Sequence, residues 1–227
     1  MKIFFDGSDL HEIGAVLERG LARGITTNPT QISEQAAGRP LHHIQRIVRL
    51  VEQRDLELPI SVQVMAHDPG DIEYQARRII DEVAYKQLVI KIPCSWELLP
   101  VISRLAGDGV PVNCTACVTV SQSLIAASAG ARYVSLFCGK MSDAGLDPAT
   151  VIAEAAPLVE KQGGELIAAS LRRSFDVPVF ARAGAHITTL PLRYLEPLAA
   201  HPKTVEAVDL FARNYVPLEE TGRTEPR

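Results

Sequence analysis

The sequence predicts a single α/β domain, a closed (β/α)8 TIM barrel with a C-terminal helix. Eight short apolar runs recur along the chain, amphipathic segments separate them, and 227 residues is a usual length for such a barrel. Because parallel strands need a crossover, usually a helix, to return the chain, this alternation predicts a parallel sheet. An open doubly wound sheet is the alternative, and eight units favour closure.

The eight runs have the composition of buried strands. In chain order they are KIFFDG (2–7), GITTN (24–28), SVQVMA (61–66), QLVIKIP (87–93), VPVNCTA (110–116), YVSLFCG (133–139), ELIAAS (165–170) and HITTLP (186–191). Helices are predicted between them, because residues 71–84, 120–131 and 149–162 carry apolar residues at three- and four-residue spacing. Residues 202–215 predict the C-terminal helix, so barrel and helix cover residues 1–216. Residues 217–227 are polar and are expected to form a flexible tail.

Composition and charge exclude several classes of protein. The formal net charge of −4 provides no basic field, so neither nucleic acid nor a membrane surface is expected as a partner. The N-terminal apolar run ends at Asp6 and is too short for a signal peptide or a membrane span, which predicts a cytoplasmic protein.

The cysteines and histidines predict no metal site. Cys114 and Cys117 have CxxC spacing, but residues three apart on a strand point to opposite faces, so free buried thiols are expected. The six histidines show no metal-ligand spacing. His67 is expected to lie in a loop, with a place at the barrel mouth as the alternative.

Lys91 lies among the apolar residues of QLVIKIP, although lysine is almost never fully buried without compensation. One explanation is a strand-end lysine whose amine reaches solvent. If Lys91 instead faces the barrel interior, other strands place inward groups near their C-terminal ends, where barrel enzymes carry their active sites. These are Asp6, Thr26, Asn28, Gln63, Asn113, Thr115, Ser135, Phe137 and Ser170. Such a set predicts an active site.

Burial between apolar walls lowers the pKa of a lysine, because desolvation disfavours the ammonium form. The free amine can then form a Schiff base with a ketone, and the protonated imine accepts electrons from a breaking carbon–carbon bond. Asp6 is the only carboxylate in this inward set and can move the proton of the β-hydroxyl, while Gln63 and Thr115 can hold a water. The lysine supplies the electron sink, so no cofactor is expected.

The chain resembles the small-subunit transaldolases, in the group that also contains the fructose 6-phosphate aldolases. The resemblance covers residues 4 to about 215 and rests on motifs in the family's order: FFDGSD, GITTNPT, VIKIP, VNCT, YVSLFCGK, AASLR and GAHITTLP. It implies a homo-oligomer, a ring of five or ten copies in which the C-terminal helix reaches a neighbour.

The resemblance also implies roles for individual residues. Lys91 is the Schiff-base lysine, Asp6 the acid and base at the substrate hydroxyl, and Thr115 positions the catalytic water with Gln63. The substrate-binding residues are Thr26, Asn28, Asn113, Phe137 and Ser170. The substrate phosphate contacts Ser170, Arg172 and Lys140.

Three positions depart from the family pattern. Gln63 stands where transaldolases usually carry glutamate and where the aldolase branch has glutamine. Phe137 is typical of transaldolases, because the aldolase branch is expected to have tyrosine there. Lys140 replaces an arginine and gives up its bidentate fork. The two branch markers, Gln63 and Phe137, therefore disagree.

The leading hypothesis is a transaldolase, which an erythrose 4-phosphate acceptor would place in the pentose phosphate pathway and a longer acceptor in a specialised sugar pathway. It would transfer a dihydroxyacetone unit from fructose 6-phosphate or sedoheptulose 7-phosphate to an aldose phosphate. Erythrose 4-phosphate and longer acceptors such as ribose 5-phosphate both remain open. A fructose 6-phosphate aldolase on the same lysine is the first alternative, and a catalytically silent sugar-phosphate-binding barrel is the second.

Overall fold

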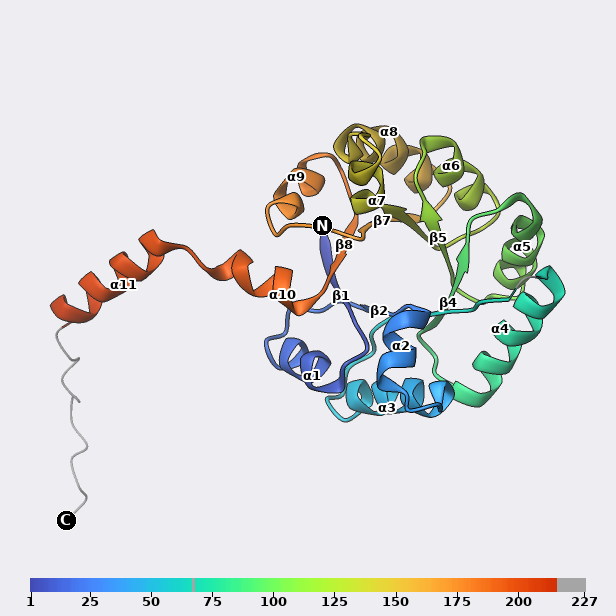
Figure 1. Cartoon of the computed structure of the whole chain (residues 1–227), viewed down its shortest axis with the longest axis horizontal. Helices are drawn as coiled ribbons and strands as arrows, with labels where there is room; N and C mark the ends of the chain where they lie inside the picture. The colour runs from blue at the N-terminus through green and yellow to red at the C-terminus, as the bar shows by residue number, and fades with distance from the viewer. Residues whose placement is uncertain (67, 216–227) are drawn as a thin grey trace, which may run out of the picture.

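The computed structural model describes residues 1–66 and 68–215. Within them, eight parallel strands follow one another around a closed barrel, and β8 pairs with β1 to complete it. Helices surround the barrel on all sides (Figure 1). The predicted (β/α)8 barrel is confirmed, and the alternative of an open sheet is wrong.

Each predicted apolar run overlaps one strand of the barrel, although β3 begins one residue before its run and β5 ends one residue after its run. The strands are β1 (Lys2–Asp6), β2 (Ile25–Thr26), β3 (Ile60–Gln63), β4 (Leu88–Pro93), β5 (Val112–Cys117), β6 (Tyr133–Phe137), β7 (Glu165–Ala169) and β8 (Ile187–Leu190). The C-terminal ends of all these strands lie at one end of the barrel, because the strands are parallel.

The helices begin where local sequence favours a helix start. They are α1 (Leu10–Glu18), α2 (Pro29–Gln35), α3 (Pro40–Glu52), α4 (Pro69–Val83), α5 (Leu99–Gly107), α6 (Val120–Ser128), α7 (Cys138–Asp143), α8 (Pro148–Lys161), α9 (Asp176–Arg182), α10 (Leu192–Leu195) and α11 (Pro202–Asn214), with short 3-10 helices η1 (Trp96–Leu98) and η2 (Glu196–Ala199). Asp9, Asp68, Thr119 and Asp147 accept backbone N–H hydrogen bonds as N-caps of α1, α4, α6 and α8.

The strand β5 differs from the prediction at the CxxC segment. Its register against β6 shifts between Cys114, which pairs with Val134, and Cys117, which pairs with Leu136. Three steps along β5 therefore match two along β6, and Ala116 takes a left-handed conformation with φ of 62°. The expectation that the two thiols point apart is wrong, because this bulge brings their sulfur atoms within 4.8 Å of each other.

Two apolar cores hold the barrel together. The larger core lies between the strands and the surrounding helices, and the smaller one fills the barrel interior. The interior core consists of Phe4, Val89, Tyr133, Ile167, Ala169 and Ile187, with Phe137 packed against it. These side chains form an apolar layer inside the barrel. Lys91 is two residues beyond Val89 on β4, so both side chains lie on the inward face of that strand.

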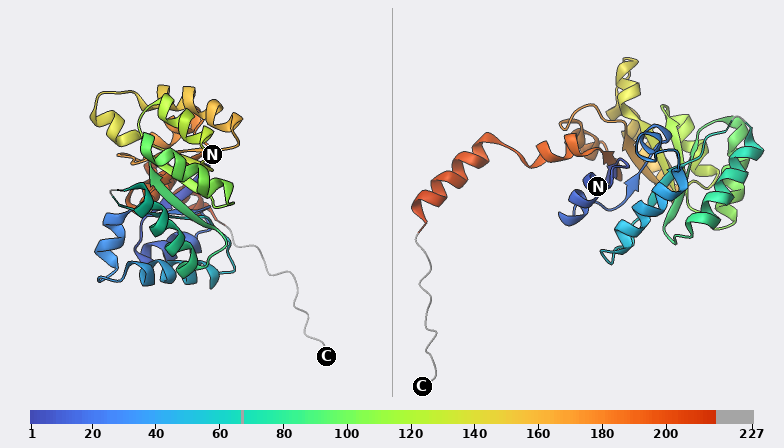
Figure 2. Two further views of the ribbon diagram at one scale, coloured as in Figure 1. Left: turned by 90° about the vertical axis from the view of Figure 1, so that its right-hand side faces the viewer. Right: turned by 60° about the horizontal axis from the view of Figure 1, so that its bottom comes forward.

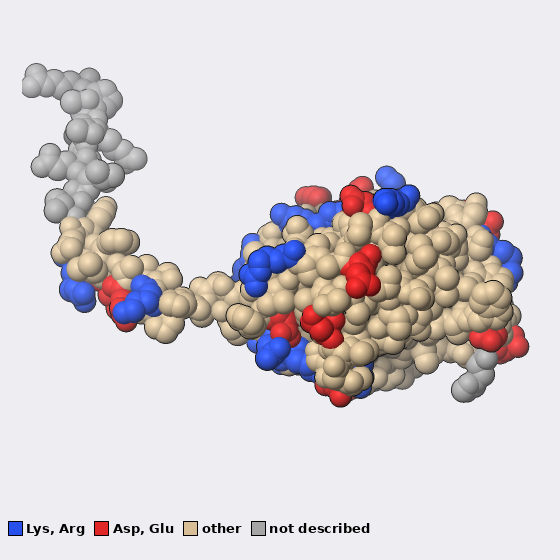
Figure 3. All heavy atoms as spheres, turned by 90° about the horizontal axis from the view of Figure 1, so that it is seen from above, with Lys and Arg blue, Asp and Glu red and all other residues tan. Residues whose placement is uncertain are grey.

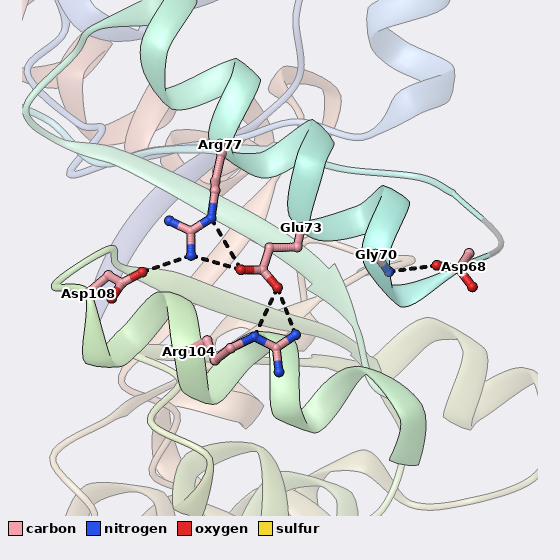
Figure 4. Close-up of polar contacts among 6 residues, drawn as sticks. All are labelled: Asp68, Gly70, Glu73, Arg77, Arg104 and Asp108. Atoms are coloured by element: carbon pink, nitrogen blue, oxygen red, sulfur yellow. Dashed lines mark hydrogen bonds and ion pairs between the residues drawn. The ribbon is translucent and has the colours of Figure 1, made fainter.

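A network of exposed ion pairs connects α4 to α5 (Figure 4). Glu73 of α4 accepts hydrogen bonds from Arg77 on its own helix and from Arg104 on α5. Arg77 also contacts Asp108, just beyond α5, at 2.8 Å. The hydrogen bonds from Arg104 and Arg77 lower the pKa of Glu73. Each exposed pair contributes little by itself, but the network fixes the relative positions of two neighbouring helices.

The helix α11 extends away from the barrel, and the right-hand view of Figure 2 shows the same separation (Figures 1 and 2). It has no buried residue, and Val205, Val208 and Phe211 are among its exposed apolar side chains. Basic and acidic side chains are interspersed on the faces of α11 and of the barrel drawn in Figure 3. No helix in the described part of the chain is long and apolar enough to cross a membrane. The predicted flexible tail, residues 217–227, and His67 lie outside the described residues.

Candidate active site at the C-terminal mouth of the barrel

A cavity of about 510 Å³ opens at the C-terminal ends of the strands. Nine of the twelve residues named from the sequence for the site line it, namely Asp6, Thr26, Asn28, Gln63, Lys91, Ser135, Phe137, Ser170 and Arg172. They come from β1, β2, β3, β4, β6 and the loops that follow β2 and β7. The cavity is therefore an assembly of strand ends, as the alternation of inward residues predicted.

Lys91 projects into this cavity from the centre of β4. Its exposed fraction is only 6%, and its Nζ atom donates a hydrogen bond of 3.1 Å to the carbonyl oxygen of Thr27. Burial lowers the pKa of Lys91, and the nearby carboxylate of Asp6 opposes that shift. The alternative of a lysine whose amine reaches solvent is wrong. Lys91 is a nucleophile candidate, because a lowered pKa raises the fraction of free amine at a given pH.

Asp6 ends β1 and is held in place by two donors. Its Oδ1 accepts hydrogen bonds from Thr26 Oγ1 at 3.3 Å and from Gln31 Nε2 at 3.1 Å. Thr26 is in turn hydrogen-bonded to Thr189 of β8 at 2.6 Å. Among the described residues, Oδ2 of Asp6 takes part in no hydrogen bond, so this oxygen is available to a ligand in the cavity.

Asn28 and Gln31 form a capping box at the start of α2. Oδ1 of Asn28 accepts from the backbone N–H of Gln31, and Oε1 of Gln31 accepts from the backbone N–H of Asn28, both at 3.0 Å. The box leaves the amide NH2 groups of both side chains as donors. Gln31 uses its NH2 group on Asp6, whereas that of Asn28 has no hydrogen-bond partner within the described residues and can donate to a ligand. Sequence analysis missed Gln31, although N-x-x-Q before an apolar residue was a usable signal.

Asn113 and Thr115 of β5 are fully buried and do not line the cavity. Asn113 donates to Ser61 Oγ at 3.3 Å and accepts from Ser135 Oγ at 2.8 Å, so it contacts the cavity through Ser135. The register places Asn113 beside Lys91, with Gln63 on the other side of Lys91. The hydroxyl of Thr115 has no hydrogen-bond partner among the described residues, which is unusual for a buried polar group.

Ser170 and Arg172 form one rim of the cavity, after β7. Ser170 has a left-handed backbone with φ of 60°, a conformation rare outside glycine. Gly139 fits against this loop because it has no Cβ atom, and a Cβ there would overlap the carbonyl oxygen of Ser170. Arg172 forms an ion pair of 2.7 Å with Asp143. Lys140 lies exposed on α7, outside the cavity lining, and its charge also acts on Asp143.

Further residues complete the lining. Phe137 ends β6 at the top of the interior core. The amide of Gln63 donates to the sulfur of Met65 at 3.2 Å. Arg193, after β8, adds a second guanidinium to the lining, and its guanidinium carbon lies 4.7 Å from the ring centroid of Tyr194. Sequence analysis missed Arg193, because it lies beyond the strand, where the inward alternation no longer applies.

Comparison with known proteins agrees with this geometry. A sequence model described as transaldolase/fructose-6-phosphate aldolase matches residues 3–223. The chain belongs to the transaldolase/fructose-6-phosphate aldolase family. It is 34% identical to a probable transaldolase of Dehalococcoides mccartyi, over 95% of this chain and 98% of that protein.

Two further relatives show a similar likeness. A probable transaldolase of Parvibaculum lavamentivorans is 34% identical over 98% of this chain and 99% of its own length. Probable transaldolase 2 of Listeria monocytogenes is 35% identical over 95% of this chain and 96% of its own. The family resemblance predicted from the motifs is thus confirmed, and the alignment extends over nearly the whole barrel.

Proposed function

We propose that this protein is a transaldolase that transfers a dihydroxyacetone unit between sugar phosphates through a Schiff base on Lys91. The observation that carries the proposal is the burial of Lys91, with a lowered pKa, in a polar cavity that Asp6 also lines. The donor would be fructose 6-phosphate or sedoheptulose 7-phosphate, and the acceptor an aldose phosphate, as in the pentose phosphate pathway.

The first step forms the imine. The free amine of Lys91 attacks the ketone carbon of the donor, the carbonyl oxygen takes up a proton, and water leaves the carbinolamine. Gln63 and the buried hydroxyl of Thr115 are proposed to hold the water that carries these protons. The protonated imine then withdraws electrons from the neighbouring carbon–carbon bond.

The second step breaks that bond. Asp6 takes the proton from the β-hydroxyl, the bond between the third and fourth carbons cleaves, and the aldose phosphate leaves. The electron pair remains on the three-carbon unit as an enamine, which attacks the aldehyde of the acceptor while Asp6 returns the proton. Water then adds to the new imine, and the product ketose phosphate leaves the free amine of Lys91. The available Oδ2 of Asp6 and the NH2 group of Asn28 are suited to hold the substrate hydroxyls.

The phosphate is assigned to the rim formed by Ser170 and Arg172. A guanidinium can contact two phosphate oxygens at once, and Arg172 already points a terminal nitrogen at the carboxylate of Asp143. Lys140 is proposed to contribute charge from α7 and not a direct contact, because it lies outside the cavity lining. Arg193 provides a further cation for a phosphorylated acceptor or donor.

Borohydride trapping tests the proposal. The protein is incubated with fructose 6-phosphate, reduced, digested and analysed by mass spectrometry. A three-carbon or six-carbon adduct on Lys91 is expected, and it should be absent from Lys91→Met, while Lys161→Met, an exposed control on α8, keeps it. A wild type without any adduct would favour the silent sugar-phosphate-binding barrel.

An aldolase that releases free dihydroxyacetone is the second candidate, and Gln63 favours it, because by resemblance the aldolase branch has glutamine at this position. Phe137 favours transfer, because its ring offers no hydroxyl to a water beside the imine. A donor–acceptor matrix read by mass spectrometry separates the two candidates and identifies the acceptor.

The protein is also proposed to form a homo-oligomer through α11. This helix leaves Val205, Val208 and Phe211 exposed by more than half, at three-residue spacing along one helix. Exposed apolar residues in such an array are typical of an interface. The family resemblance suggests that the covering surface belongs to a neighbouring copy in a ring of five or ten.

A further inference from the structure

Three cysteine thiols converge outside the cavity. The Sγ atoms of Cys94, Cys114 and Cys117 all lie within 4.8 Å of one another. Cys94 follows directly after β4, whereas Cys114 and Cys117 belong to β5. Cys114 and Cys117 are fully buried, and Cys94 is partly buried. None of the three is among the described residues that line the cavity.

The bulge of β5 is what brings the thiols together. In a regular strand Cys114 and Cys117 would project from opposite faces, so Cys117 would enter the barrel. The left-handed Ala116 adds a residue to β5 and returns Cys117 to the outer face. Alanine rarely adopts this conformation, and strained residues of this kind persist where the surrounding structure fixes them, often at functional sites.

Metal binding requires deprotonated sulfur, because the thiolate and not the thiol is the ligand form of cysteine. An ion bound at this cluster would therefore replace thiol protons and release them to solvent.

The spacing suits sulfur ligands of a single ion. Sulfur atoms bound to zinc at about 2.3 Å in a tetrahedral arrangement lie about 3.8 Å apart. Small side-chain movements reach this spacing from separations of at most 4.8 Å. Soft thiolate ligands select Zn²⁺ and Cu⁺ over Mg²⁺ and Ca²⁺. Three thiolates complete a trigonal site for Cu⁺, and they hold Zn²⁺ with a water as the fourth ligand.

We propose that Cys94, Cys114 and Cys117 form a binding site for one thiophilic metal ion, Zn²⁺ or Cu⁺, on the outer side of β4 and β5. The ion reaches the site from the side of Cys94, the partly exposed member. The site adjoins the catalytic strands, because the backbone N–H of Cys94 donates to the carbonyl oxygen of Thr115 at 2.8 Å. The occupied site would fix the ends of the two strands that carry Lys91 and Thr115.

Metal titration of the reduced full-length protein tests this inference without any measurement of turnover. Zn²⁺ and Cu⁺ are titrated separately against a coloured competing chelator, and Co²⁺ is added as a spectroscopic probe. The expected result is one ion per chain, sulfur-to-cobalt charge-transfer absorption, and release of thiol protons on binding.

Matched variants locate the site. Cys94→Ser and Cys117→Ala should each weaken binding by about 100-fold or more, because each removes a direct ligand. Cys138→Ala is the control: Cys138 is also buried but lies outside the cluster, and burial raises its pKa to about 12. Cys94→Ser changes a partly exposed residue at a strand end, so it should fold even if Cys117→Ala does not.

Two outcomes would overturn the inference. One is wild-type affinity for both ions in Cys94→Ser. The other is a wild type that binds neither ion after full reduction. If that protein loses two hydrogen atoms in mild oxidant, two of the thiols form a disulfide instead of a metal site.

Discussion

Gln31 donates a hydrogen bond from its Nε2 atom to Oδ1 of Asp6 across 3.1 Å, and so connects the first turn of α2 to the end of β1. The same glutamine closes the capping box with Asn28. The Gln31 side chain thus sets the position of Asp6, which is proposed to act as both acid and base, and the position of the Asn28 amide, which is proposed to bind substrate. The local stability of the start of α2 and the geometry of the cavity depend on the same contacts.

Asp6→Ala should still form the imine but fail to cleave the carbon–carbon bond. We expect the rate of transfer to fall by about 10²–10⁴, the usual contribution of a positioned acid or base. Borohydride trapping with fructose 6-phosphate should yield the intact six-carbon adduct on Lys91. Normal cleavage by this variant would remove Asp6 from the mechanism.

Gln31→Ala should lower turnover by a smaller factor, about 10-fold, because Asp6 keeps its hydrogen bond from Thr26. A hydrogen bond to a charged group contributes about 1.5–3 kcal/mol, and the remaining donor compensates for part of its loss. Single-turnover kinetics measures the effect on cleavage, and thermal unfolding measures the loss of the capping box. Unchanged turnover with reduced stability would leave Gln31 a role in capping alone.

Arg172→Ala should raise the KM for phosphorylated substrates by about 10- to 100-fold, in line with the loss of a charge-assisted contact of about 1.5–3 kcal/mol. Unphosphorylated donors such as fructose should be affected little. Asp143→Asn is the companion variant, because it removes the charge that competes with phosphate for Arg172. Equal losses on both kinds of substrate would assign Arg172 a structural role.

The pKa of Lys91 makes a prediction about stability. Burial lowers this pKa below the ordinary value of 10.5, so the folded chain loses the proton at a lower pH than the unfolded chain. Between the two pKa values the unfolded chain binds more protons, and stability therefore rises with pH. Below the folded pKa the desolvated ammonium destabilises the fold to its full extent.

At about pH 7, Lys91→Met should accordingly unfold at a higher temperature than the wild type. Its free energy of unfolding should be higher by about 1–3 kcal/mol. The difference should shrink as the pH approaches the ordinary lysine pKa. Thermal denaturation of both proteins across this range is the measurement. A difference that grows with pH would contradict the lowered pKa.

The barrel and half of the cavity lining could be predicted, mainly because strands and inward residues both follow from alternation. Apolar runs marked the strands, and the parity of Lys91 identified which neighbouring residues share its face. Gln31 was missed because it acts from a helix, and Arg193 because it follows a strand. Lys140 was assigned to the phosphate by resemblance, but α7 begins at Cys138, so strand parity does not determine where Lys140 points.

The bulge at Ala116 could not be predicted from the sequence by the same means. Glycine or asparagine would have indicated a left-handed residue, whereas alanine gives no such signal. The strand parity assumed across Ala116 then placed Cys117 on the wrong face. A single residue with positive φ thus changed an expected pair of separate thiols into a cluster of three.

The proposed assembly through α11 makes a further prediction. Light scattering should give a multiple of the 24.7 kDa chain mass, and Phe211→Asp should reduce it, because the exposed ring would no longer be available for burial at an interface. Asp209→Ala, on the same helix, serves as the control and should keep the assembly. A monomeric wild type would show that α11 has another partner or none.

The last prediction concerns the partition of the enamine on Lys91 between transfer and release. Release needs a proton on the enamine carbon and then a water that attacks the imine. Phe137 lines the cavity without a polar group, and Gln63, beside Lys91 in the strand register, offers only an amide. The intermediate should therefore wait for an aldehyde acceptor, so that transfer dominates.

Phe137→Tyr adds a hydroxyl at the end of β6 and should raise the release of dihydroxyacetone from fructose 6-phosphate relative to transfer. Gln63→Glu should instead improve transfer, because a carboxylate can exchange a proton with the water during imine formation. The measurement is dihydroxyacetone release without acceptor, compared with transfer to erythrose 4-phosphate, for the wild type and both variants. If the wild type already releases dihydroxyacetone as fast as it transfers it, the protein is an aldolase in its chemistry, and Phe137 does not determine the branch.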